Sequence, residues 1–205
     1  MMRHLSSALT ASILPIAVAT ALPAAAGDPG FDCTKASGEI ETLICGDADL
    51  AALDRKLADV YGASLRKLKG AADEHAAVKS LKAEQRGWIK GRNDCWKAED
   101  KRACTEDAYK MRIALLQARY VLVPGGKPVF YTCNGNPADE LAATFFPTDP
   151  QAVRLERGDR QTIALQARSA SGARYLGDFG ILFWEHHGTA QVEWPEGTKF
   201  ECTVR

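Results

Sequence analysis

Hydrophobic residues recur at two different periods along the chain, and the period changes once, near residue 123. Over roughly residues 47–122 they return every three or four positions, which is the pattern of amphipathic helices. Beyond residue 128 they alternate with polar residues at every second position, which is typical of half-buried strands. The chain is therefore expected to be α+β in two domains, with helices first and strands second.

Three helices with short connections are expected in the first half, and they should form a small antiparallel bundle. They span roughly residues 47–70, 72–91 and 105–122. Asp47 or Asp49 can cap the first helix, and Gly70 can end it. Thr105 can cap the third helix, whose first turn also carries acidic residues that suit the helix dipole.

Two prolines and two glycines within residues 123–128 end the helical pattern and predict a short linker. Seven or eight short strands should follow. Turn residues separate them at Asn134-Gly135, Arg157-Gly158-Asp159, Ser171-Gly172 and Pro195-Glu196-Gly197. Short strands with regularly spaced turns indicate a small antiparallel β-barrel.

The first 26 residues have the composition of a secretory signal peptide. A weakly basic start precedes an apolar core, and small residues mark a cleavage site near Ala26. The core is too short to span a bilayer, and no cysteine follows the cleavage site directly. We expect a periplasmic or secreted protein without stable membrane insertion. Its parts are a signal peptide (1–26), a helical domain (27–122), a linker (123–128) and a barrel (129–205).

The six cysteines are even in number and follow a signal peptide, so disulfide bonds are expected: Cys33, Cys45, Cys95, Cys104, Cys133 and Cys202. Cys133 ends the first expected strand and Cys202 lies in the last, so a bond between them would join the two ends of the barrel. In the helical half we expect Cys33–Cys45 and Cys95–Cys104, with Cys33–Cys104 as the alternative. No C-x-x-C pair occurs, so no metal site is expected.

Charge and motifs exclude several functional classes. Lysine and arginine balance aspartate and glutamate at 26 each, and no basic run suggests nucleic-acid binding. No G-x-S-x-G sequence indicates an activated serine. His186 and His187 are adjacent, so in an extended strand their rings would point to opposite faces and could not share a metal. We expect a binding protein without cofactor, not an enzyme; its oligomeric state stays open.

Two polar turns flank a short apolar strand in the second half and form the candidate contact site. Ser171 and Gly172 make the first turn, and His186, His187 and Gly188 make the second. Polar turns held on a rigid sheet are suited to probing a cleft in another molecule.

The run Ser171-Gly172-Ala173-Arg174-Tyr175, followed by Trp184 and a basic residue near Gly188, resembles the MliC/PliC-type inhibitors of c-type lysozyme. The resemblance covers roughly residues 128–205. It implies that Ser171 bonds the catalytic carboxylates of a c-type lysozyme, with Gly172 and Tyr175 beside it. The family's second contact is a lysine, which is missing here. Alignment places His186 or His187 at its position.

The first half resembles the LprI family, secreted helical domains of which some are described as lysozyme inhibitors. The resemblance covers roughly residues 31–120. It rests on the four cysteines and on Gln85, Arg86, Trp88 and Arg92, whose simplest role is packing and surface hydrogen bonding. Together the halves predict a lysozyme inhibitor; the alternative is a periplasmic interaction or chaperone-like module that lost inhibition with its lysine.

Overall fold

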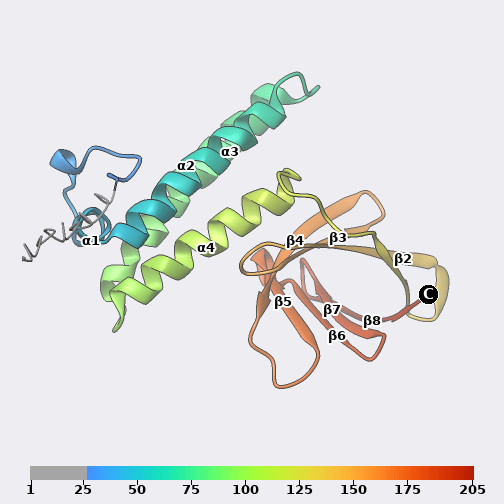
Figure 1. The fold of residues 1–205 in the computed structure, drawn as a ribbon. Helices are drawn as coiled ribbons and strands as arrows, with labels where there is room; N and C mark the ends of the chain where they lie inside the picture. Colours follow the sequence, from blue (N-terminus) through green and yellow to red (C-terminus); the bar gives the residue numbers. More distant parts are fainter. Residues whose placement is uncertain (1–26) are drawn as a thin grey trace, which may run out of the picture.

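The computed structural model describes residues 27–205, and the expected signal peptide lies outside them. In Figure 1 the helices form an elongated bundle, and the strands form a barrel beside the end of the last helix. Helices occupy the first half and antiparallel strands the second, so the expected α+β fold class is confirmed.

Four α-helices make up the first half, one more than the sequence predicted. They are α1 (Glu39–Gly46), α2 (Ala48–Leu68), α3 (Glu74–Asn93) and α4 (Lys101–Arg119), with short 3-10 turns η1 (Cys33–Lys35) and η2 (Asp94–Lys97). All four helices contribute buried side chains to one core: Ile40, Ile44, Leu50, Leu57, Leu81, Tyr109, Ile113 and Leu116. Helix α1 has eight residues, which is too short for its period to stand out in the sequence.

Aspartate side chains cap helices α2 and α4. Asp47 caps α2 by accepting from two backbone N–H groups, as expected, and Gly70 follows that helix with φ of 80°. The expected start of the last helix at Thr105 is wrong. Helix α4 begins at Lys101, because Asp100 caps it through the N–H three residues later.

Eight antiparallel strands form a closed barrel in which each strand pairs with its neighbours in sequence and the last returns to the first. They are β1 (Val129–Cys133), β2 (Asn136–Phe146), β3 (Ala152–Arg157), β4 (Arg160–Ala167), β5 (Ala173–Gly177), β6 (Leu182–His186), β7 (Thr189–Trp194) and β8 (Thr198–Val204). Large side chains fill the interior: Tyr131, Leu141, Tyr175, Phe183, Val192, Trp194 and Phe200.

Helix α4 packs against the outside of the barrel, over β3 and β4. Ala114 and Ala118 of the helix join Ile163 and Leu165 of β4 in a buried cluster. Ala164, between those two strand residues, faces the barrel interior. The apolar face of β4, which the alternating pattern identified, therefore packs against α4. The small residue Ala164 on the other face points into the barrel core.

Three disulfide bonds join the cysteines in the pairs favoured by the sequence: Cys33–Cys45, Cys95–Cys104 and Cys133–Cys202. The first two are local to the helical half. Cys133 and Cys202 lie opposite each other on β1 and β8, so their bond fastens the seam at which the barrel closes.

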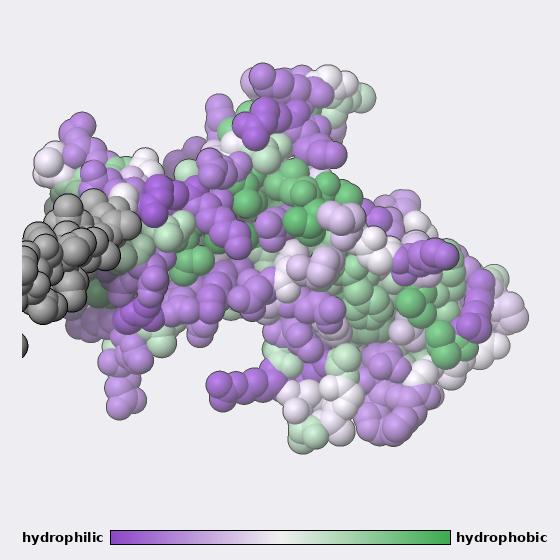
Figure 2. All heavy atoms as spheres, viewed as in Figure 1, coloured by the Kyte–Doolittle hydropathy of each residue, from purple (hydrophilic) through white to green (hydrophobic). Residues whose placement is uncertain are grey.

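The surface is unevenly polar. Figure 2 shows hydrophilic side chains over much of the helices and a hydrophobic patch between the tip of the α2–α3 hairpin and the barrel. Among residues 27–205, no helix combines the length and the apolar character that crossing a membrane requires.

Candidate functional site

The two candidate turns lie side by side at one end of the barrel. Strand β5 begins just after the Ser171 turn, β6 leads into the His187 turn, and the two strands are antiparallel partners. A Cβ atom added to Gly172 would lie 2.3 Å from the backbone oxygen of Glu185 and 3.1 Å from Cδ2 of His186. The turns therefore form one continuous tip.

Hydrogen bonds fix the backbone of the Ser171 turn and leave its side chain exposed. The Ser171 carbonyl accepts from Nε1 of Trp184 at 2.9 Å and from the Ser169 hydroxyl at 2.5 Å. Gly172 follows with φ of 67°, a conformation that glycine adopts without steric cost. The Ser171 hydroxyl makes no hydrogen bond within residues 27–205. It is therefore available to a partner while the backbone stays fixed.

His187 and Gly188 form the two-residue turn between β6 and β7, with φ of 52° and 80°. Positive φ at both central residues defines a type I′ hairpin turn, which fits the twist of paired strands. The carboxylate of Glu185 accepts from the Gly188 N–H at 2.7 Å and so braces this turn.

The two histidine rings lie together, with centroids 4.1 Å apart and planes at 81°. Our expectation that they point to opposite faces of a strand is wrong, because the strand ends at His186 and the turn redirects His187. Both residues are exposed. No group of three or more potential metal ligands occurs in the described part of the chain, so the pair has no third ligand there.

Tyr175, expected among the contact residues, is inside the barrel. Its ring is 2% exposed and packs against Phe145 and Phe183, and its hydroxyl bonds the Gln151 side chain at 2.5 Å. Burial raises the pKa of Tyr175, and the Glu185 carboxylate acts in the same direction. A ring enclosed in this way belongs to the barrel core and is not placed to touch a partner.

Three charged residues beside the turns were missed by the sequence reasoning. The carboxylate of Glu185 accepts from the Gly188 N–H and contributes, after burial, to raising the pKa of Tyr131 to about 12. Arg168 is exposed just before the first turn, and Arg174 lies opposite Trp184 on the barrel wall. Neither arginine forms an ion pair within residues 27–205. Both arginines lie within three residues of Ser171 in the sequence, and this closeness could have identified them as candidate contact residues.

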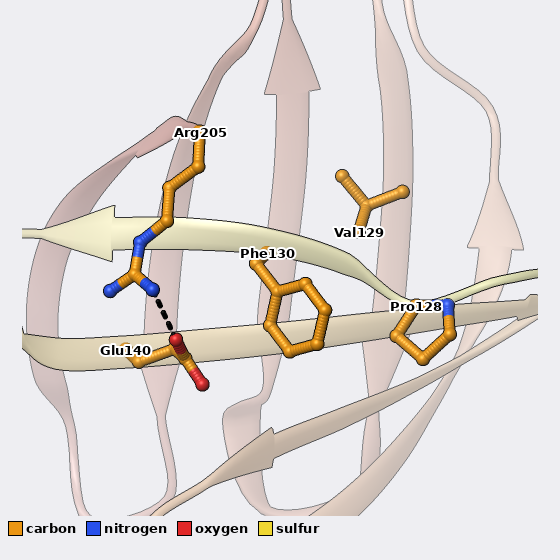
Figure 3. Close-up of a pocket in the computed structure, with 5 residues that line it drawn as sticks. All are labelled: Pro128, Val129, Phe130, Glu140 and Arg205. Atoms are coloured by element: carbon orange, nitrogen blue, oxygen red, sulfur yellow. Dashed lines mark hydrogen bonds and ion pairs between the residues drawn. The ribbon is translucent and has the colours of Figure 1, made fainter.

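A separate shallow pocket lies beside β1 and is lined by Pro128, Val129, Phe130, Glu140 and Arg205 (Figure 3). Arg205 is the cation in it. It forms an ion pair with Glu140 and donates to the Thr132 hydroxyl at 2.9 Å and to the Pro137 carbonyl at 2.9 Å. Because these partners already satisfy the guanidinium, we assign no site to this pocket.

Two family models match the chain in succession. Residues 33–122 match the model described as lysozyme inhibitor LprI. Residues 131–200 match the model described as membrane-bound lysozyme-inhibitor of c-type lysozyme. The helical half and the barrel thus define a protein of the lysozyme-inhibitor class, in the order that the two resemblances predicted.

Relatives of the whole chain identify the family more closely. "Lipoprotein LprI" of Mycobacterium bovis is 30% identical over 205 residues, covering 98% of both chains. The protein of the same name in two strains of Mycobacterium tuberculosis matches equally well. The chain belongs to the LprI family.

Proposed function

We propose that the protein is an extracytoplasmic inhibitor of c-type lysozyme that inserts the Ser171 turn and the His187 turn into the active-site cleft. The observation that carries this proposal is the contact between the two turns at Gly172, which makes them a single tip. The inhibitor descriptions of both matched families suggest the target and a role in binding rather than catalysis.

The tip can offer hydrogen-bond donors to a cleft that contains two carboxylates. The exposed Ser171 hydroxyl is one donor, and a protonated ring of His186 or His187 is a second. Hydrogen bonds to an ionised carboxylate are shorter and about twice as strong as neutral ones. Arg168 and Arg174 add positive charge beside the two turns, which partly replaces the contact lysine of the MliC/PliC-type inhibitors.

Rigidity of the tip favours binding, because little conformational freedom is lost when a fixed turn is enclosed. Three contacts hold the backbone in place: the bonds of Trp184 and Ser169 to the Ser171 carbonyl, and the bond of Gly188 to Glu185. Glu185 would repel the target's carboxylates if it were free. Its bond to a backbone N–H reduces that effect.

Competition with a saccharide tests insertion into the cleft. Binding of the full chain to lysozyme would be measured with and without a chitin trisaccharide that occupies the cleft. We expect the apparent dissociation constant to rise linearly with trisaccharide concentration, by the factor one plus the ratio of that concentration to the trisaccharide's own dissociation constant. An apparent constant that does not change would mean that the protein binds lysozyme elsewhere.

A further inference from the structure

A groove of about 680 Å³ lies where the helical half meets the barrel. Its hydrophobic walls come from α4, β4, β5 and the 3-10 turn η3 (Asp178–Gly180): Met111, Leu115, Ile163, Leu165, Leu176 and Phe179. Met111 is half exposed, and Phe179 is 90% exposed at the rim. Strand β5 runs from the Ser171 turn to η3, so the groove and the inhibitory tip lie at opposite ends of that strand.

Arg112 lines this groove and is 5% exposed. Its Nε donates to the Gln85 side chain at 3.0 Å, and its Nη1 lies 3.7 Å from the Glu84 carboxylate. Its Nη2 is buried and has no hydrogen-bond partner within residues 27–205. Leaving a buried donor unsatisfied costs about 1–3 kcal/mol, and more for a charged group. A hydrogen bond from this nitrogen to an acceptor on a ligand would remove that cost and so favour binding of the ligand.

Positive charge predominates by one unit among the charged residues that line the groove. Three arginines and two acidic residues line the groove, giving a formal balance of +1: Arg92, Arg112 and Arg119 against Glu84 and Asp178. Glu84 accepts from Arg119 at 2.7 Å, and Arg92 donates to the Tyr109 hydroxyl at 2.7 Å. Burial lowers the pKa of Arg112, and the nearby Glu84 carboxylate opposes this effect. The charge balance favours an anion.

We propose that the groove binds an amphiphilic carboxylate, whose aliphatic chain lies against the hydrophobic walls and whose carboxylate accepts from Nη2 of Arg112. The volume is within the range of about 300–1,000 Å³ typical of small-molecule sites. Met111 is unbranched and half exposed, so it can move aside to admit the head group. Trp88 and Arg92 also line the groove, and the Gln85 side chain holds the guanidinium of Arg112 in place.

Dodecanoate, kept below the concentration at which it forms micelles, is the probe. Calorimetric titration of the full chain should show saturable binding of one molecule. Acetate should show none, and dodecyltrimethylammonium should bind at least about tenfold more weakly, because it has the same chain with the opposite charge. Equal affinity for the two amphiphiles would overturn the carboxylate assignment, and absence of saturable dodecanoate binding would overturn the site.

Substitutions locate the binding. Met111→Glu places a like charge on an exposed groove residue and should weaken dodecanoate binding at least about tenfold. Phe130→Ala, at an exposed aromatic outside the groove, is the matched control and should leave it unchanged. Arg112→Gln should remove the preference for the anion, provided that its circular dichroism is native. Native affinity in the Met111→Glu variant would refute the groove as the site.

The two proposals fail independently, because the tip and the groove are at opposite ends of β5. Met111→Glu should bind lysozyme as the native protein does. A variant that loses dodecanoate but keeps lysozyme binding supports the groove, whatever the outcome of the saccharide competition. Loss of both activities in this variant would contradict separate sites.

Discussion

Gly172 is the residue at which the two turns of the tip meet. Its φ of 67° and the 2.3 Å distance from an added Cβ to the Glu185 oxygen are separate reasons for glycine at this position. The first is backbone strain, which affects any turn with positive φ. The second is a clash specific to the contact between the turns, and it can be measured separately.

Gly172→Ala should lower the free energy of unfolding by about 1–3 kcal/mol more than Gly197→Ala. Both substitutions carry the cost of placing alanine at a positive φ, but only the alanine at position 172 also clashes with a neighbouring backbone oxygen and forces the turns to shift. Gly197 is the matched control, since it has φ of 79° and open space around its Cβ position. Urea unfolding of both variants gives the difference. Equal losses would mean that the turns are not in contact.

If the tip binds lysozyme as proposed, the histidine pair should make inhibition dependent on pH. Imidazole side chains gain a proton between about pH 8 and 5, so the positive charge that the target's carboxylates attract increases as pH falls. We expect inhibition to strengthen from about pH 8 to 5.5 and to weaken again where lysozyme's own carboxylates become protonated.

Lysine at the true contact position should remove this dependence and strengthen inhibition near neutrality. We expect His187→Lys to do so, because residue 187 is an exposed central residue of the turn whereas His186 ends strand β6, and His186→Lys is the control. Inhibition by the native protein that stays flat between about pH 5.5 and 8 would mean that neither histidine replaces the family's lysine.

At the scale of elements, the sequence predicted most helices and strands, because local patterns of residues determine them. It did not predict which neighbour each face contacts, because that depends on residues distant in the sequence. The alternation around Tyr131 and Phe200 located strands whose inward faces the structure confirms. The same alternation could not say that Ile163 faces α4, since a helix and a barrel interior both accept an apolar side chain. The histidine rings were misplaced because the type I′ turn, and not the strand, sets the direction of His187.

The ion pair between β2 and the end of β3 makes the barrel sensitive to acid. Arg157 donates to both carboxylate oxygens of Asp139 at 2.8 Å, and these bonds lower the pKa of Asp139 below its usual value. The pair therefore stabilises the fold above the unfolded-state pKa of about 3.9, and this contribution is lost as pH falls through the lower folded-state value.

Asp139→Asn should destabilise the protein at about pH 7 and have little effect at about pH 2.5, as measured by urea unfolding. Asp159→Asn, at an exposed position in the turn after β3, should have little effect at either pH. A loss from Asp139→Asn that is as large at low pH as at neutrality would contradict the assigned role of the ion pair.

At the scale of the whole molecule, α4 belongs to two cores. Tyr109, Ile113 and Leu116 pack among the helices, whereas Ala114 and Ala118 pack against the barrel. One helix therefore couples the two halves, although residues 123–128 have the composition of a linker. We therefore expect the two halves to unfold as one unit, although they are separate in sequence.

We expect the native chain to unfold in urea in a single transition, because loss of α4 removes part of both cores. Ala118→Asp should separate it into two transitions, since an unpaired charge buried between helix and barrel costs several kcal/mol. Far-ultraviolet circular dichroism would report the helices. Fluorescence of Trp184 and Trp194, measured with Trp88 and Trp96 replaced by phenylalanine, would report the barrel. Two resolved transitions in the native protein would contradict coupling through α4.

The central claim is that the tip around Ser171 inhibits c-type lysozyme, and the inhibition constant of the Ser171→Ala variant tests it most directly. Lysis of cell-wall substrate would be followed with the full chain carrying Ser171→Ala or Ser80→Ala, the latter at an exposed serine on α3. We predict inhibition weakened by about 1–3 kcal/mol, roughly 5- to 150-fold, for Ser171→Ala only. Inhibition constants that are the same for both variants and the native protein would contradict the claim.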